Sequence, residues 1–298
     1  MLTTVAIFLD GLNFAAWLFL ASSGLTMIYG VMRILNIAHG SFYAFGAYTA
    51  ATFVGLYSAT DSAPALVYIL LFVAAMAVGI ILGLIIERGF LRFMYKSDEV
   101  LMVLVTYALF LILEDAAKLI WGVDAYFAFQ PYAYLGLVEI FGLPYQVYDL
   151  ALIALAAICG FSLWWGMNKT RIGKLLLVVI EDREISAGLG INVALIFTLT
   201  FIIGATLGAL GGAVTAPKIS VNPGLGVEAI VMAFAVVVIG GLGSIEGAMV
   251  GSIIVGFARA ASVHLLPEVE LFAIYGVMAL VLAIKPYGLF ARAEGRKI

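Results

Sequence analysis

The sequence is poor in charge. Only 11% of its 298 residues are Asp, Glu, Lys or Arg, whereas 65% are hydrophobic. Soluble domains carry about 25% charged residues, so a chain of this size could not cover a water-exposed surface with so few. An ordinary cytosolic enzyme and a disordered protein are therefore excluded. The composition, with a mean hydropathy of +1.17, is typical of a multi-span membrane protein.

Cysteine is almost absent as well. Cys159 is the single one and lies within an apolar run, which excludes an internal disulfide and a cysteine-based metal site. The sequence also lacks the signatures of serine hydrolases, zinc proteases and P-loop ATPases. We therefore expect a protein that is not an enzyme and does not hydrolyse ATP by that route itself. No basic residue precedes Arg33, so the first apolar run is predicted to be a retained span rather than a signal peptide.

Long apolar runs fill the chain instead. Nine can be read, at 4–32, 41–60, 64–86, 100–121, 148–167, 193–216, 228–240, 244–263 and 271–285. A membrane-spanning helix needs about 20 apolar residues, and continuous runs favour helices over a barrel. The sequence therefore predicts an all-α polytopic membrane protein with about eight to nine transmembrane helices, some broken or re-entrant. We expect residues 1–298 to form a single transmembrane domain.

The basic residues are unevenly distributed between the loops. Eleven of the 15 lie in segments 87–99 and 168–192 and in the C-terminal stretch from Lys285 onward. The alternate loops hold mostly acids, with Lys218 as the exception. Because basic loops tend to stay on the cytoplasmic side, these three segments are predicted to be cytoplasmic and the aromatic-rich segment 122–147 external. Nine crossings then place the N-terminus outside and the C-terminus inside.

Two short stretches interrupt the apolar runs. The first holds Asn36, His39, Gly40 and Ser41, and the second holds Gly240, Gly241, Gly243 and Ser244, with Glu246 just behind it. Broken helices in matching halves often mark a transport pathway, although glycine-rich membrane segments also resemble one another by chance. Asn36 and His39 either cap backbone groups at a helix break or line a pathway. Glu246 either stabilises the first turn of a helix that Ser244 caps or serves as a pathway carboxylate.

The predicted cytoplasmic loop 168–192 contains a pattern of its own. Three acids, Glu181, Asp182 and Glu184, are followed by two glycines, Gly188 and Gly190. Acids complement the positive end of a helix, and glycines commonly end one. We expect a short amphipathic helix near residues 181–189. The loop is either an ordinary solvated connection or a coupling helix that docks on an ATP-hydrolysing partner.

A few ionisable side chains lie inside apolar runs. Glu114, Asp115 and Lys118 are spaced so that all three can meet on one helical face. Such residues are costly in a membrane and often functional, but these are predicted to lie near the outer interface, where pairing explains them. Arg259 is expected either to snorkel or to pair with an acid. Its candidate partners are Glu268 and Glu270, and Asp10 and Asn13 receive no assigned role.

Four motifs follow one another along the chain. They are Leu35–Tyr43 with Gly46–Tyr48, the loop residues Gly173, Asp182, Gly190 and Ile191, the segment Ile239–Ser244 with Gly247 and Gly251, and the ending Lys285–Phe290. Together they resemble the branched-chain amino-acid permease family of ATP-binding-cassette (ABC) importers, LivH type. The resemblance covers nearly the whole chain, and Lys285 stands where the family more often has Arg.

The resemblance implies a permease subunit in a bacterial or archaeal cytoplasmic membrane that translocates branched-chain or other hydrophobic amino acids by alternating access. It also implies a second permease subunit, identical or homologous, an extracytoplasmic substrate-binding protein and two ATPase subunits that bind ATP and Mg. Lipid surrounds such a chain, and we expect no cofactor in it and no nucleic-acid partner. The residues implied in ATPase coupling are Gly173, Glu181, Asp182, Ser186, Gly190 and Ile191.

Two alternatives stay open at this point. An ABC permease of the same kind could carry urea or short amides instead of amino acids. A proton-coupled secondary transporter could use Glu114, Asp115 or Glu246 and would need no ATPase. An intramembrane enzyme is remote, because the sequence shows no organised nucleophile and base.

Overall fold

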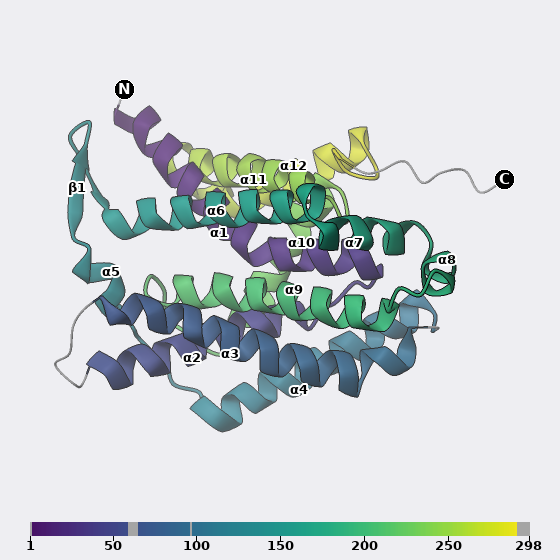
Figure 1. Ribbon diagram of the computed structural model, residues 1–298. Coiled ribbons are helices and arrows are strands. Elements are labelled where there is room, and N and C mark those ends of the chain that lie inside the picture. The colour runs from purple at the N-terminus through teal and green to yellow at the C-terminus, as the bar shows by residue number, and fades with distance from the viewer. Residues whose placement is uncertain (1, 59–64, 96, 291–298) are drawn as a thin grey trace.

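The computed structural model describes residues 2–58, 65–95 and 97–290. Asp61, Lys96 and the basic residues after position 290, which entered the prediction of orientation, lie outside these ranges. Nine long helices run alongside one another in the described part of the chain (Figure 1). They are α1 (Leu2–Met32), α2 (His39–Ser58), α3 (Leu66–Gly89), α4 (Glu99–Trp121), α6 (Val147–Lys169), α9 (Val193–Thr215), α10 (Leu225–Gly240), α11 (Ile245–Leu265) and α12 (Glu270–Ile284).

The helices confirm an all-α polytopic membrane protein. Six of those described, α1, α3, α4, α6, α9 and α11, are long and apolar enough to cross a membrane by length and composition. Two more are apolar but shorter, α10 and the stretch Phe272–Ile284 of α12. The apolar run 228–240 lies in α10, which has 16 residues.

Shorter elements connect the long helices. They are η1 (Leu91–Met94), α5 (Gln130–Tyr134), β1 (Leu137–Ile140), β2 (Leu143–Gln146), α7 (Arg171–Glu181), α8 (Arg183–Gly188) and η2 (Pro267–Val269). The two strands pair antiparallel, with Leu137 opposite Gln146. Phe141 and Gly142 both have positive φ, as a two-residue hairpin turn of type I′ requires. This hairpin is a departure from the predicted all-helical pattern.

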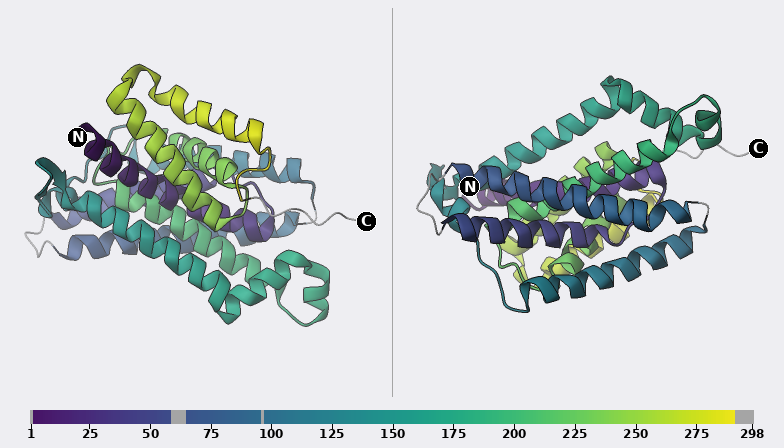
Figure 2. Two further views of the ribbon diagram at one scale, coloured as in Figure 1. Left: turned by 90° about the horizontal axis from the view of Figure 1, so that it is seen from above. Right: turned by 60° about the horizontal axis from the view of Figure 1, so that its bottom comes forward.

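Helix α9 lies at the centre of the fold and packs against α1, α2 and α3. Its glycines let the backbones approach closely, as membrane helices often do. A Cβ on Gly212 would lie 1.9 Å from the carbonyl oxygen of Tyr43 in α2, so any side chain there would force the two helices apart. Helices α4 and α6 flank the bundle on opposite sides (Figure 2). Large apolar side chains of α6, such as Ile158 and Phe161, are exposed, which suits contact with lipid.

The connections separate into two ends of the bundle (Figure 1). The hairpin, α5 and the start of α1 lie at one end, and η1 and α8 lie at the other. This arrangement agrees with the prediction that segment 122–147 is on one side of the membrane and segments 87–99 and 168–192 are on the opposite side. We refer below to the second end as the α8 end.

Candidate functional site

The two predicted interruptions lie close together in space. The first is the segment 33–38 between α1 and α2, and the second is the segment 241–244 between α10 and α11. A Cβ built on Gly243 would lie 2.8 Å from the Cα of Gly30 in the last turns of α1. The second break therefore lies backbone against backbone on α1, two residues before that helix ends at the first break, although more than two hundred residues separate the two along the chain. Gly40 and Ser41, expected in the first break, instead lie in the first turn of α2.

Side chains of distant helices satisfy the backbone at the first break. Thr106 of α4 donates its hydroxyl to the carbonyl of Leu35 at 3.2 Å and accepts the N–H of Ile37 at 3.3 Å. Arg183 of α8 donates to the carbonyl of Met32 at 2.7 Å. These bonds supply the partners that a helix end needs inside a membrane.

The expectation that Asn36 and His39 cap this break is wrong. The side chain of Asn36 is fully buried and makes no hydrogen bond within the described part of the chain. A ring nitrogen of His39 lies 3.0 Å from the carbonyl oxygen of Ala21, well inside α1. The ring also lies close to Gly24 of α1 and Gly208 of α9. His39 therefore fills the space between helices instead of completing a helix end.

The second break follows the rules of helix capping more closely. Gly241 and Gly243 have φ of 104° and 80°, a region that favours glycine because it has no Cβ. The hydroxyl of Ser244 accepts the N–H of Gly247 at 2.9 Å, which confirms the predicted N-cap of α11. At the other side, the N–H groups of Leu289 and Phe290 donate to the carbonyls of Ile239 and Gly240 at 3.0 and 2.9 Å. The C-terminal motif thus completes the end of α10.

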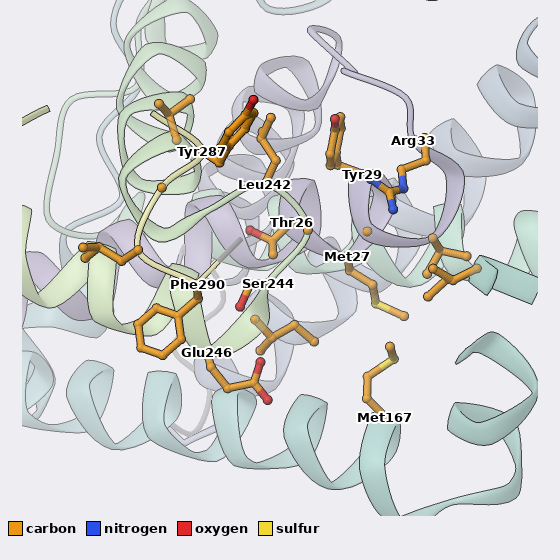
Figure 3. Close-up of a pocket in the computed structure, with 18 of the residues that line it drawn as sticks. Thr26, Met27, Tyr29, Arg33, Met167, Leu242, Ser244, Glu246, Tyr287 and Phe290 are labelled. Atoms are coloured by element: carbon orange, nitrogen blue, oxygen red, sulfur yellow. The ribbon is translucent and has the colours of Figure 1, made fainter. Parts of the chain in front are cut away.

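A cavity of about 910 Å³ lies beside both breaks. Its walls come from the end of α1, the ends of α6 and α7, the start of α11 and the segment after α12. Arg33, Glu246 and Lys285 give it charge, while Met27 and Met167 give it apolar surface (Figure 3). Glu246 lies in the first turn of α11, as the first alternative expects, and also lines the cavity. Its role as a pathway carboxylate stays a prediction.

The predicted site residues do not all reach the cavity. Gly243, Ser244 and Glu246 line it. Asn36, His39, Gly40, Ser41, Gly240 and Gly241 are not among its lining residues. Arg33 and Tyr29, which sequence reasoning did not single out, belong to its wall.

The loop between α6 and α9 folds into two helices, not one. The first, α7, was not predicted as a helix, and Thr170 caps it by accepting the N–H of Gly173 at 3.1 Å. Gly173 is buried where α7 turns back on α6, because a Cβ there would lie 2.2 Å from the carbonyl oxygens of Gly166 and Met167. Glu181 is the last residue of α7. The expectation that it opens the second helix is therefore wrong.

The second helix, α8, begins and ends at the residues that the sequence indicates. The Asp182 carboxylate accepts the N–H groups of Glu184 and Ile185, each at 2.9 Å. Gly190 has a φ of 82°, and its N–H donates to the carbonyl of Ala187. The N–H of Ile191 donates to the carbonyl of Ser186 at 3.1 Å. This pair of bonds is a Schellman motif, so Asp182 and Gly190 fix both ends of α8.

The ionisable residues of the opposite end are paired. Glu114 accepts the N–H of Gly224, at the start of α10, at 2.8 Å. Asp115 lies 3.0 Å from Lys118, so Glu114 does not join the expected cluster of three. Arg259 pairs with Glu270 at 2.5 Å, one of its two candidate partners. The residues without an assigned role also have partners, since Asp10 binds Tyr145 and His264, and Asn13 binds Lys218.

Comparison with known proteins places this architecture in a family. The family model described as "Branched-chain amino acid transport system / permease component" matches residues 7–282. The chain is 28% identical to the branched-chain amino acid permease protein BraD of Pseudomonas aeruginosa, over 97% of this chain and 96% of that one. Identity to LivH of Escherichia coli is also 28%, with the same coverage of both chains.

Similarity extends to archaea. A probable branched-chain amino acid transport permease protein LivH of Methanocaldococcus jannaschii is 27% identical over 91% of this chain and 88% of its own. No solved structure matches the chain. The match of the family model to most of the sequence confirms the resemblance that the four motifs carry. The chain belongs to the family of branched-chain amino acid transport system permease components.

Proposed function

We propose that this chain is the transmembrane permease subunit of an ABC importer and that it translocates branched-chain or other hydrophobic amino acids across the cytoplasmic membrane of a bacterium or archaeon. Relatives that align over nearly their whole length and are named as branched-chain amino acid permeases support this proposal. Residues 1–298 act as a single permease domain. ATP and Mg are bound by partner subunits, and this chain itself catalyses no reaction.

The observation that carries the proposal is that residues of both helix breaks, Arg33 of the first and Gly243 and Ser244 of the second, line one cavity. Broken helices at a shared cavity are a common basis of alternating access, because their ends can move while the rest of each helix stays packed. The cavity offers a cation, an anion and apolar side chains (Figure 3), which suit a zwitterion with an aliphatic side chain. In this scheme the α8 end is cytoplasmic, so the cavity faces the cytoplasm.

Partners complete the transporter. A second permease subunit, identical or homologous, lies beside this chain in the membrane, and an extracytoplasmic substrate-binding protein delivers the amino acid. Two ATPase subunits dock at the loop 168–192. Ile185 on α8 and Leu189 directly after it are 61% and 71% exposed and offer apolar anchors for that docking. The coupling residues are Asp182, Ser186, Gly190 and Ile191 of this segment, together with Gly173 and Glu181 of α7.

A test begins with the complex purified from its source membrane through a tag on this chain. We expect a P-loop ATPase to co-purify and the complex, reconstituted in vesicles with its binding protein, to take up labelled leucine in an ATP-dependent manner. Labelled urea serves as the competing substrate, and a protonophore serves as the control for proton coupling. Uptake that stops with the protonophore while ATP remains, or a complex that lacks an ATPase, would contradict the proposal.

A further inference from the structure

We propose that Arg183 is a positioning residue that couples movement of α8 to the wall of the cavity. This inference rests on the proposed function, because it takes α8 as the element that an ATPase moves. It goes beyond the docking of α8 and concerns how a displacement at the surface reaches the helix breaks.

Arg183 joins α8 directly to the end of α1. Its Nη2 atom donates to the carbonyl of Met32 at 2.7 Å, and its guanidinium carbon lies 4.8 Å from the centre of the Phe197 ring in α9. Hydrogen bonds from a charged donor are stronger than neutral ones. The guanidinium is half-buried between these two groups, and burial together with nearby Arg33 lowers the pKa of Arg183. The bond therefore fixes the first turn of α8 against α1.

The carbonyl that Arg183 holds belongs to the last turn of α1. Intrahelical N–H donors run out in that turn, so a side chain must supply one. Arg33, the next residue, has a φ of 58°, which a residue other than glycine adopts rarely. The chain turns away from α1 at this point, directly after the carbonyl that Arg183 holds.

The same turn of α1 forms part of the cavity wall. Tyr29, Gly30, Val31 and Arg33 all line the cavity, and Gly30 touches Gly243 of the second break. On the other side of the break, Thr106 of α4 holds Leu35 and Ile37. A pull on Met32 from α8 therefore acts on the end of α1 and on its contact with the second break, while the segment that leads into α2 stays attached to α4.

The opposite face of α8 is free for a partner. Ile185 and Leu189 are exposed, whereas Ser186 is fully buried and donates its hydroxyl to the carbonyl of Asp182. An ATPase that contacts the exposed face therefore acts on a helix that Arg183 bonds to α1. This division of α8 into two faces makes Arg183 a link between the docking surface and the cavity.

The experiment compares Arg183→Gln and Arg183→Lys with Arg171→Gln, which removes an exposed arginine from the same loop. Each variant is purified with its ATPase and reconstituted with the binding protein. For Arg183→Gln we expect normal ATPase co-purification and basal ATP hydrolysis, but a drop of about tenfold or more in substrate taken up per ATP, as loss of one charge-assisted hydrogen bond implies. Arg183→Lys should be intermediate, because lysine keeps the charge but not the planar donor group. Arg171→Gln should behave like the wild type.

A second readout reports on the cavity wall itself. Tyr29→Cys in a Cys159→Ala background allows thiol alkylation to be timed with and without ATP. The rate should respond to ATP in the parent protein and should stop responding when Arg183→Gln is added. Wild-type coupling and a wild-type alkylation response in Arg183→Gln would overturn the inference. Failure of both Arg183 variants to assemble would also overturn it, since Arg183 would then serve folding. Absence of an ATPase from every sample would instead refute the proposed function.

Discussion

Glu114 illustrates how this chain places ionisable side chains within its helices. Its carboxylate accepts the N–H of Gly224, at the N-terminus of α10, where the helix dipole favours negative charge. Glu87 is fully buried in α3 and accepts hydroxyl hydrogen bonds from Tyr95 and Thr198. Lys218 lies 2.6 Å from both Asp149 and Asn13. Each of these side chains therefore has polar partners that stabilise it where it lies.

The first residue-scale prediction concerns Glu114 and Asp115. Glu114→Gln keeps an acceptor for the N–H of Gly224 and loses only the charge, which costs about 0.3–1 kcal/mol. Asp115 is largely exposed and its pair with Lys118 contributes about 0–1 kcal/mol. The double variant Glu114→Gln and Asp115→Asn should therefore retain most ATP-dependent uptake of leucine in vesicles. Loss of uptake in a complex that still assembles would show that these carboxylates take part in transport.

At the scale of elements, the ends of α8 and α11 follow from local sequence. Asp182 and Ser244 are N-caps, and Gly190 has the left-handed backbone that ends a helix. Each of these interactions joins residues no more than a few positions apart, so spacing alone predicts it. The apolar runs predict the spans for the same reason, because burial in lipid depends on the composition of each run.

Other elements could not be predicted from local spacing. The partners of the first break lie 71 residues away at Thr106 and 151 residues away at Arg183, and no spacing rule joins such positions. Asn36 and His39 looked suited to capping, but the packing of α1, α2 and α9 decides their contacts instead. The hairpin turn Phe141-Gly142 lacks the Asn-Gly or Asp-Gly signature of such turns. Helix α7 was missed because its apolar side chains were attributed to a connection.

The element-scale prediction concerns both ends of α8. Gly190→Val places a β-branched side chain at a φ of 82°, and Asp182→Lys removes the N-cap, a loss of about 0.5–2 kcal/mol. Both variants should reach the membrane in normal amounts and lose substrate-stimulated ATP hydrolysis, Gly190→Val more than Asp182→Lys. Gly188→Ala is the matched control, because a Cβ at Gly188 meets open space and its backbone is helical. Normal stimulation in both variants would mean that α8 does not transmit the signal.

At the scale of the whole molecule, the two ends of the bundle differ in composition. Segments rich in basic residues lie at the α8 end, and the hairpin and α5, with exposed aromatic side chains such as Phe141 and Tyr134, lie at the other. The start of α1 and the end of α12 lie toward opposite ends of the bundle (Figure 1). The charge bias predicts that the α8 end faces the cytoplasm.

The whole-molecule prediction turns this orientation into a measurement. Single cysteines at Lys174 and Arg92 of the α8 end, and at Tyr134 and Glu139 of the hairpin end, are introduced in a Cys159→Ala background. All four positions are exposed in the structure, so burial does not limit their reaction. An impermeant thiol reagent should label the Tyr134 and Glu139 cysteines in intact cells and reach the Lys174 and Arg92 cysteines only after the membrane is opened. The reverse pattern would place the cavity and α8 outside the cell, where no ATPase could dock, and would remove the physical basis of the proposed coupling.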